Sequence, residues 1–325
     1  MKKSLALLCV VLFVTEILYS CKSDNFADNM KNKRTISEQI TSPSQKEFVI
    51  MVDSISQTYK KTRGISQADV SSASRKVLVG VVADGIGSVI GSGFVSIVTG
   101  FVASTAYDSY LSWVERQMSR TLTPVESNVK DINKDPKYNS ISDSLKFVFS
   151  DNNPKNMEDS IGFMHNLMLN EVNLMNHTYS TDYGIDYDKL MDDAKNIATD
   201  IGYSCNQLDS LDARKIYAFY AEMNNVLIRL PEEHMSDDDA FFEIACSLEK
   251  ILGKEKSVFI SALSKSVFSY IGQNVDLQDI TLYSNELNSV LKDSNLSDND
   301  KTFCKKLFQV MVCSYAYWKC LRGVQ

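Results

Sequence analysis

Apolar side chains recur every three or four residues along most of the chain, which is the spacing of an amphipathic helix. The first such pattern consists of Phe48, Met51, Val52 and Ile55, and it predicts a helix that begins near Gln45. Further helices are predicted from Pro154 to Met175 and at about 187–204, 211–230, 237–252, 255–273, 277–292 and 298–321. Successive helices with short connections predict an all-α fold, a multi-helix bundle.

Polar residues mark where several of these helices begin. Ser236 with Asp239, and Ser297 with Asp300, are typical of an N-cap followed by an acid in the first turn. Pro124 and the stretch Asp131–Pro136 interrupt the helical pattern. We therefore place a domain boundary near residue 125, which separates a helical region, 46–124, from an all-helical bundle, 125–325.

One segment differs from the rest of the chain in its composition. The 31 residues from Val77 to Tyr107 contain a single charge, Asp84, and six of the 13 glycines. Small or polar residues occupy every fourth position, and a row of bulky apolar residues runs two positions away. The small row is Gly80, Asp84, Ser88, Ser92, Ser96, Gly100 and Ser104. This row predicts a helix face that a neighbouring backbone can approach closely.

The pattern of that row resembles the glycine-zipper segments of membrane-associated bacterial proteins. A glycine in a water-exposed helix costs about 1 kcal/mol relative to alanine, so the segment needs close packing or lipid around it. Two interpretations remain open. In one, 77–107 is the Gly/Ser-rich apolar central helix of the bundle, or a helical hairpin broken at Asp84–Gly87. In the other, the uncharged stretch enters a bilayer or forms an oligomeric zipper.

The N-terminus has the layout of a secretory signal. Lys2 and Lys3 precede an apolar run, Leu5–Val14, that is too short to span a bilayer stably. The run leads to Leu18-Tyr19-Ser20-Cys21, which resembles the lipobox of bacterial lipoproteins. The resemblance implies that residues 1–20 are removed and that Cys21 carries lipid as the first residue of the mature chain.

The residues after Cys21 bear on where such a lipoprotein resides. Lys22 stands where the family's inner-membrane signal has Asp, so the resemblance implies the outer membrane, with the lipid as the anchor. The stretch Lys22–Asn25 is similar to tags that direct some lipoproteins to the cell surface, and a plain polar tether is the alternative. Residues 21–45 are polar and are predicted to be a flexible tether.

Charge argues against nucleic acid as the partner. The chain has a formal charge of −7, and removal of Lys2, Lys3 and Glu16 with residues 1–20 shifts it to −8. An acidic body does not attract phosphate backbones. The partners expected instead are the membrane, through the lipid anchor, and a second protein or a second copy of the chain.

Cysteine and histidine provide little support for a cofactor or a metal. Beyond Cys9 and Cys21, five cysteines remain, at 205, 246, 304, 313 and 320, and an odd number leaves at least one free thiol. No C-x-x-C or H-E-x-x-H spacing occurs among the seven cysteines and three histidines. We expect no metal and no cofactor.

One string containing a histidine stands out. Ser160–Leu167 resembles a Gly-x-x-His-Asn-x-x-Leu string of uncharacterised bacterial lipoproteins and secreted proteins, and it draws attention to His165 and Asn166. His165 is either a general base or metal ligand, or a histidine packed beside Gly162 and hydrogen-bonded in the core.

No nucleophile elbow or phosphate-binding loop is present, so no catalytic residue is assigned. The function expected first is a lipid-anchored, extracytoplasmic interaction or envelope module without catalysis. A membrane-active protein, toxin-like or pore-forming, that uses the segment 77–107 is the alternative, and a hydrolase with an unidentified site is third.

Overall fold

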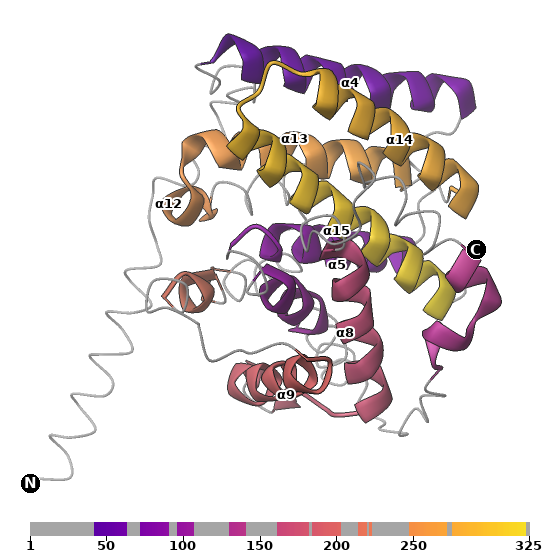
Figure 1. Ribbon diagram of the computed structural model, residues 1–325, viewed down its shortest axis with the longest axis vertical. Coiled ribbons are helices and arrows are strands. Elements are labelled where there is room, and N and C mark those ends of the chain that lie inside the picture. The colour runs from indigo at the N-terminus through magenta and orange to yellow at the C-terminus, as the bar shows by residue number, and fades with distance from the viewer. Residues whose placement is uncertain are drawn as a thin grey trace, which may run out of the picture. The chain divides into compact units, whose positions relative to one another are not determined.

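Helices make up nearly all of the regular structure. The computed structural model describes residues 42–63, 72–90, 96–106, 130–140, 161–181, 184–202, 214–219, 221–222, 247–271 and 275–322. All of them lie in one unit, Ile40–Gln325. The prediction of an all-α, multi-helix bundle is confirmed (Figure 1).

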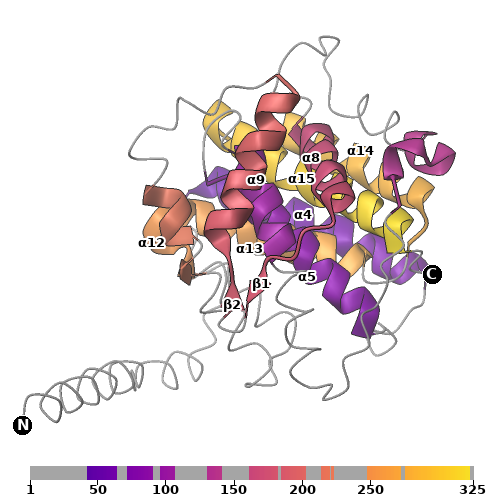
Figure 2. The same cartoon turned by 90° about the horizontal axis from the view of Figure 1, so that it is seen from below.

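The long helices are α4 (Pro43–Arg63), α5 (Ser72–Gly87), α8 (Ile161–Met175), α9 (Tyr187–Asp200), α13 (Lys254–Ile271), α14 (Leu277–Asp293) and α15 (Asp298–Arg322). The short elements are η2 (Ile132–Lys134), α12 (Glu249–Leu252) and the strands β1 (Ser180–Thr181) and β2 (Gly184–Ile185). Residues 96–106 and 136–140 are helical as well. The two strands pair in an antiparallel ribbon, which lies at one end of α9 in Figure 2.

Helix ends follow the capping residues in the sequence. The predicted N-cap of α15 is confirmed, because the Asp300 backbone N–H donates to Ser297 Oγ at 3.2 Å and that hydroxyl donates to the Asp300 carboxylate at 2.8 Å. α4 begins at Pro43, two positions before the expected start, since proline fits the first turn of a helix without losing a hydrogen bond. The predicted cap at Ser236 lies outside the described residues.

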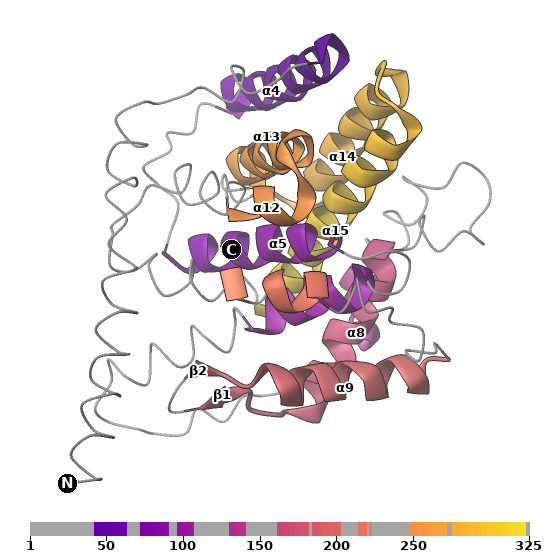
Figure 3. The ribbon, with the colours of Figure 1, turned by 90° about the vertical axis from the view of Figure 1, so that its left-hand side faces the viewer.

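α15 is the central helix of the bundle. It packs against α5, α8, α13 and α14, and Figure 1 shows it crossing in front of α5. Its residues 307–317 are all buried, which explains why this helix has apolar residues on every side. α4 covers α13 and α14 at one side of the bundle, where Phe48 meets Phe259 edge to face. α8 packs against α9 at the other side (Figure 3).

The Gly/Ser-rich segment forms a helical hairpin in the core. Its first arm is α5, which ends at Gly87, and a turn at 88–90 follows; residues 96–106 form the second arm. We call α5 and residues 96–106 the Gly-rich hairpin. The expected break at Asp84–Gly87 lies slightly later in the structure, because α5 continues to Gly87 and the turn occupies residues 88–90.

Burial of the hairpin is complete over its middle. All described residues from Gly80 to Ile90 and from Ser96 to Ala106 are buried. None of the described helices is both long enough and apolar enough to cross a membrane. The expected domain boundary near residue 125 lies outside the described residues, and helices before and after it pack together in one unit.

Candidate functional site

The acidic residue of the Gly-rich hairpin faces a histidine from another helix. Asp84 on α5 and His165 on α8 are both 0% exposed, and Asp84 Oδ2 lies 3.7 Å from His165 Nε2. Burial of a carboxylate is costly unless a partner compensates for its charge. His165 is the polar side chain that α8 directs at that carboxyl group, and we take this buried polar cluster as the candidate functional site.

Glycine allows these elements to approach so closely. A Cβ atom at Gly100 would lie 2.9 Å from the carbonyl oxygen of Asp84 and 3.3 Å from His165 Cδ2. A Cβ atom at Gly87 would lie 2.6 Å from the carbonyl oxygen of Thr99. The two arms of the hairpin thus meet backbone to backbone, and His165 sits against their crossing point.

Gly162 on α8 likewise allows α15 to approach closely. A Cβ atom at Gly162 would lie 2.6 Å from Cys313 Sγ and 2.9 Å from the carbonyl oxygen of Gln309. This contact places His165, one turn further along α8, beside the part of α15 that carries Ser314. Ser314 Oγ donates a hydrogen bond to Asp84 Oδ2, so three elements meet at one carboxylate.

The asparagine next to His165 orients its ring. Asn166 Nδ2 donates to Tyr138 Oη at 2.9 Å and to the carbonyl oxygen of Cys313 at 2.8 Å. Its Oδ1 then lies 3.2 Å from His165 Nδ1. Because an amide oxygen only accepts, His165 Nδ1 carries the proton of that bond, and Nε2 faces Asp84.

Two polar atoms at the centre of the cluster lack hydrogen-bond partners. They are Asp84 Oδ1 and His165 Nε2. Burial raises the pKa of Asp84 above its ordinary value of 3.8, while the neighbouring side chains of His165, Ser314 and Ser104 oppose that rise. Ser104 also accepts a hydrogen bond from Trp318 Nε1 at 3.3 Å. The carboxyl group thus holds its proton more tightly than an exposed one.

The order of the groups differs from that of a hydrolase triad. In such a triad the imidazole lies between the hydroxyl and the carboxylate and takes the hydroxyl proton. Here Ser314 donates to the carboxylate of Asp84, which stands between Ser314 and His165. All three side chains are also completely buried, so a substrate has no direct contact with them. The geometry supports holding a proton rather than activating a nucleophile.

Of the seven small-row positions predicted as a packing face, six are described, and all six are buried. Gly100 and Ser104 contact the cluster, and Ser88 Oγ, in the turn after α5, donates to the carbonyl oxygen of Gly85 at 2.6 Å. Ser92 and Cys21 lie outside the described residues.

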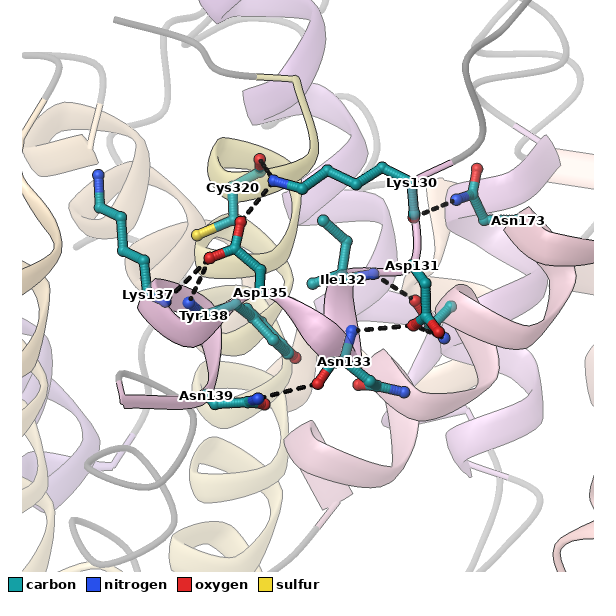
Figure 4. A network of polar contacts seen from close by, with 11 residues as sticks. Lys130, Asp131, Ile132, Asn133, Asp135, Lys137, Tyr138, Asn139, Asn173 and Cys320 are labelled. Carbon is teal, nitrogen blue, oxygen red and sulfur yellow. Dashed lines mark hydrogen bonds and ion pairs between the residues drawn. The ribbon is translucent and has the colours of Figure 1, made fainter.

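A second polar network attaches residues 130–140 to α8 and α15 (Figure 4). The Lys130 ammonium pairs with Asp135 and donates to the carbonyl oxygen of Cys320 at 3.4 Å, near the end of α15. Asp135 Oδ1 accepts from the backbone N–H of Lys137 and caps the helix 136–140. The hydrogen bond from Lys130 lowers the pKa of Asp135. This network positions Tyr138, whose hydroxyl accepts from Asn166 in the buried cluster.

The second described histidine lies at the surface. His177 Nδ1 is 2.7 Å from Asp193 Oδ2, and the Tyr179 hydroxyl donates to the same oxygen at 2.8 Å. Among the described residues, no group of three or more histidine, cysteine or acidic side chains is arranged to hold a metal ion. His234, Cys205 and Cys246 lie outside those residues. Cys304, Cys313 and Cys320 are free thiols.

Sequence patterns alone did not link Asp84 with His165 and Ser314. A signal was present, since a single charge in an otherwise uncharged apolar segment requires a partner when that segment is buried. The sequence does not show which residue provides it.

Comparison with known proteins gives no match: neither the family models, nor the curated proteins, nor the solved structures contain a significant relative.

Proposed function

We propose that this chain is a lipid-anchored, extracytoplasmic helical protein of the outer membrane that acts without catalysis, as an interaction or envelope module. The anchor is inferred from the lipobox-like Leu18–Cys21 and the signal-like residues before it. The lipid would hold the bundle at the membrane, and residues 21–45 would serve as its tether.

The complete burial of His165 carries the non-catalytic part of this proposal. It was the strongest candidate for a catalytic side chain in the sequence, and it is 0% exposed and directed at Asp84. A general base has to come within hydrogen-bond reach of its substrate. His165 meets other parts of the same chain instead, which favours a role in holding the bundle together.

Metabolic labelling tests the anchor. The full chain is expressed in a Gram-negative host fed with a radiolabelled fatty acid, beside a Cys21→Ala variant and a Cys9→Ala control. We expect label in the wild-type and Cys9→Ala proteins, and none in Cys21→Ala, because only Cys21 is acylated. Equal labelling of all three chains, or of none, would refute the lipoprotein proposal.

The second candidate function is membrane activity, and the position of the Gly-rich hairpin favours it. The Gly-rich hairpin packs against α8, α13 and α15, and its residues 80–90 and 96–106 are shielded from water. A hairpin that left this site would expose a surface suited to lipid or to another copy of itself. This candidate requires the bundle to open.

Alkaline extraction separates the two candidates. The chain with Cys21→Ala, exported behind an ordinary cleavable signal, is incubated with membranes and washed at high pH. Release into the supernatant is the result expected for a packed core hairpin, and it supports the non-catalytic module. Retention in the pellet would show that the hairpin inserts, and the membrane-active function would then replace the first. A variant with Asp84→Lys as well, which places an uncompensated charge in the hairpin, should lower any retention that depends on it.

A further inference from the structure

The Asp84–His165 pair lies where three parts of the fold are joined. Asp84 belongs to the first arm of the Gly-rich hairpin, His165 to α8, and Ser314, which donates to Asp84, to α15. The second arm touches the pair through Gly100, whose Cβ position is 3.3 Å from His165 Cδ2. Whatever changes the charge of this pair acts on all of these contacts together.

Burial restricts the charge that the pair can carry. Both side chains are 0% exposed, and Asp84 Oδ1 and His165 Nε2 have no hydrogen-bond partner. A net charge at such a site is strongly unfavourable, whereas a neutral pair is tolerated. Since His165 Nδ1 already carries a proton toward Asn166, neutrality requires one further proton between Asp84 and His165 Nε2.

The neighbouring elements supply no charge to replace that proton. From α15 the ionisable groups around the pair are the Cys313 thiol and the Tyr317 hydroxyl, and from helix 136–140 the Tyr138 hydroxyl. Burial raises the pKa of Cys313 to about 12, so this thiol stays neutral. Residues 96–106 contain no ionisable side chain.

α13 also packs against α5 but does not direct a charge at the pair. Its Lys254, Glu255 and Lys265 are exposed and Lys256 is partly exposed. Ser104 is the remaining polar group of the second arm that acts on Asp84. Among the described residues, the proton balance of the site is therefore set by Asp84 and His165.

We propose that Asp84 and His165 share one proton and form a pH-dependent latch, which holds the Gly-rich hairpin against α8 and α15 most tightly between about pH 3.9 and 6.5 and loosens as the pH rises above that range. The latch is a property of the folded bundle, and it goes beyond both functions proposed above.

The direction of this pH dependence follows from the number of protons that the two groups bind in the folded and in the released chain. In a released or unfolded chain an aspartate ionises near pH 3.9 and a histidine near pH 6.5, so above about pH 6.5 the two groups together hold no proton beyond the one on the neutral ring. The folded pair still holds one more. Opening then releases a proton, and each pH unit lowers the folding equilibrium constant by up to about tenfold.

The raised pKa of Asp84 changes the stability of the fold with pH in the same direction. A carboxyl group whose pKa is higher in the folded chain stabilises the fold at low pH, and this contribution is lost as the pH rises through the raised value. Between about pH 3.9 and 6.5 the pair contributes no slope, because folded and released chains hold equal numbers of protons. Below that range the released chain binds one more proton, and the hairpin loosens again.

The test is the pH dependence of unfolding by urea, measured on the full chain in mild detergent. Wild type, Asp84→Asn and His177→Gln are compared between about pH 6.5 and 8.5, the range in which the latch changes. We expect the folding equilibrium constant to fall about tenfold more per pH unit in the wild type than in Asp84→Asn. His177→Gln removes a partly exposed imidazole and should keep the wild-type slope. Equal slopes in wild type and Asp84→Asn would overturn the proposal.

Hydrogen exchange of the wild type provides an independent measurement, which decides the matter if Asp84→Asn does not fold. Peptides from 80–90 and 96–106 are compared with peptides from α14, after correction for the intrinsic pH dependence of exchange. The latch predicts that the opening constant of the hairpin peptides rises with pH relative to those of α14. A constant ratio across the range would reject the latch.

Discussion

Glycines determine how closely the polar groups at the centre of this protein approach one another. Gly100 permits the second arm of the hairpin to lie against the carbonyl oxygen of Asp84, and Gly162 permits α8 to lie against α15. Neither position needs glycine for its backbone conformation, since the described positive φ angles of glycine occur at Gly202 and Gly253. The missing side chain is what matters at these contacts.

Substitution of Gly100 tests this role at the scale of one residue. Gly100→Ala would place its Cβ atom 2.9 Å from the backbone oxygen of Asp84, and a backbone atom cannot rotate away as a flexible side chain can. We expect the free energy of unfolding to fall by about 1–3 kcal/mol, as for other overpacked cores. Urea denaturation at a single pH measures the change.

Asn285→Ala is the matched control for the substitution itself. Asn285 is exposed in the middle of α14, so alanine there should leave stability unchanged or raise it slightly through its helix propensity. If Gly100→Ala were as stable as the control, the close crossing of the two arms would be wrong.

α8 contacts two other parts of the fold, α15 and the segment 130–140. Gly162 faces α15, while three asparagines at spacings of four and three residues bind the segment 130–140. Asn166 donates to Tyr138, Asn170 accepts from the backbone N–H of Ile132 at 3.0 Å, and Asn173 donates to the carbonyl oxygen of Lys130 at 3.2 Å. Such spacings align residues on one face of a helix. We call the face formed by Asn166, Asn170 and Asn173 the asparagine face of α8.

Asn170, the middle residue of the asparagine face, should contribute most to the stability of this contact. In Asn170→Ala the buried backbone N–H of Ile132 loses its acceptor, and leaving a buried donor unpaired costs about 1–3 kcal/mol. We expect faster hydrogen exchange in 130–140 and a lower urea midpoint. Asn173→Ala, one turn further along, removes an exposed hydrogen bond and should change both by much less. Equal effects of the two variants would contradict the larger contribution assigned to Asn170.

At the scale of the whole molecule, α15 joins the parts of the bundle. It contacts α13 and α14 on one side and α5 and α8 on the other, and it contributes Ser314 to the buried cluster. The Gly-rich hairpin is therefore held through α15 as well as through α8. Membrane activity would require these contacts to break, whereas an interaction module would use the bundle as it stands.

Secondary structure was largely predictable from the sequence. The apolar periodicity located α13, α14 and α15 to within a few residues, since the positions a helix buries are set by its own repeat. The capping pair Ser297 and Asp300 fixed the start of α15 for an equally local reason. α4 began earlier than its apolar pattern because proline, rather than hydrophobicity, determined its first turn.

The site was only partly predictable. Asp84, His165 and the small residues of the hairpin stood out individually, but three further features came from the structure: the contact between Asp84 and His165, the role of Ser314 and the crossing at Gly100. Asp84 and Ser314 are 230 residues apart in the chain. A pairing over that distance leaves no periodic signal, because it depends on how the helices pack and not on the repeat of any one of them.

The sequence by itself thus determined the all-α class, most helix boundaries and the composition of the Gly-rich segment, since each depends on neighbouring residues. Only the tertiary structure decided that this segment is a hairpin within the bundle, with its single carboxylate against His165. The physical reason is that an apolar, glycine-rich helix is stable wherever close packing replaces water, and the sequence does not specify which surface packs against it.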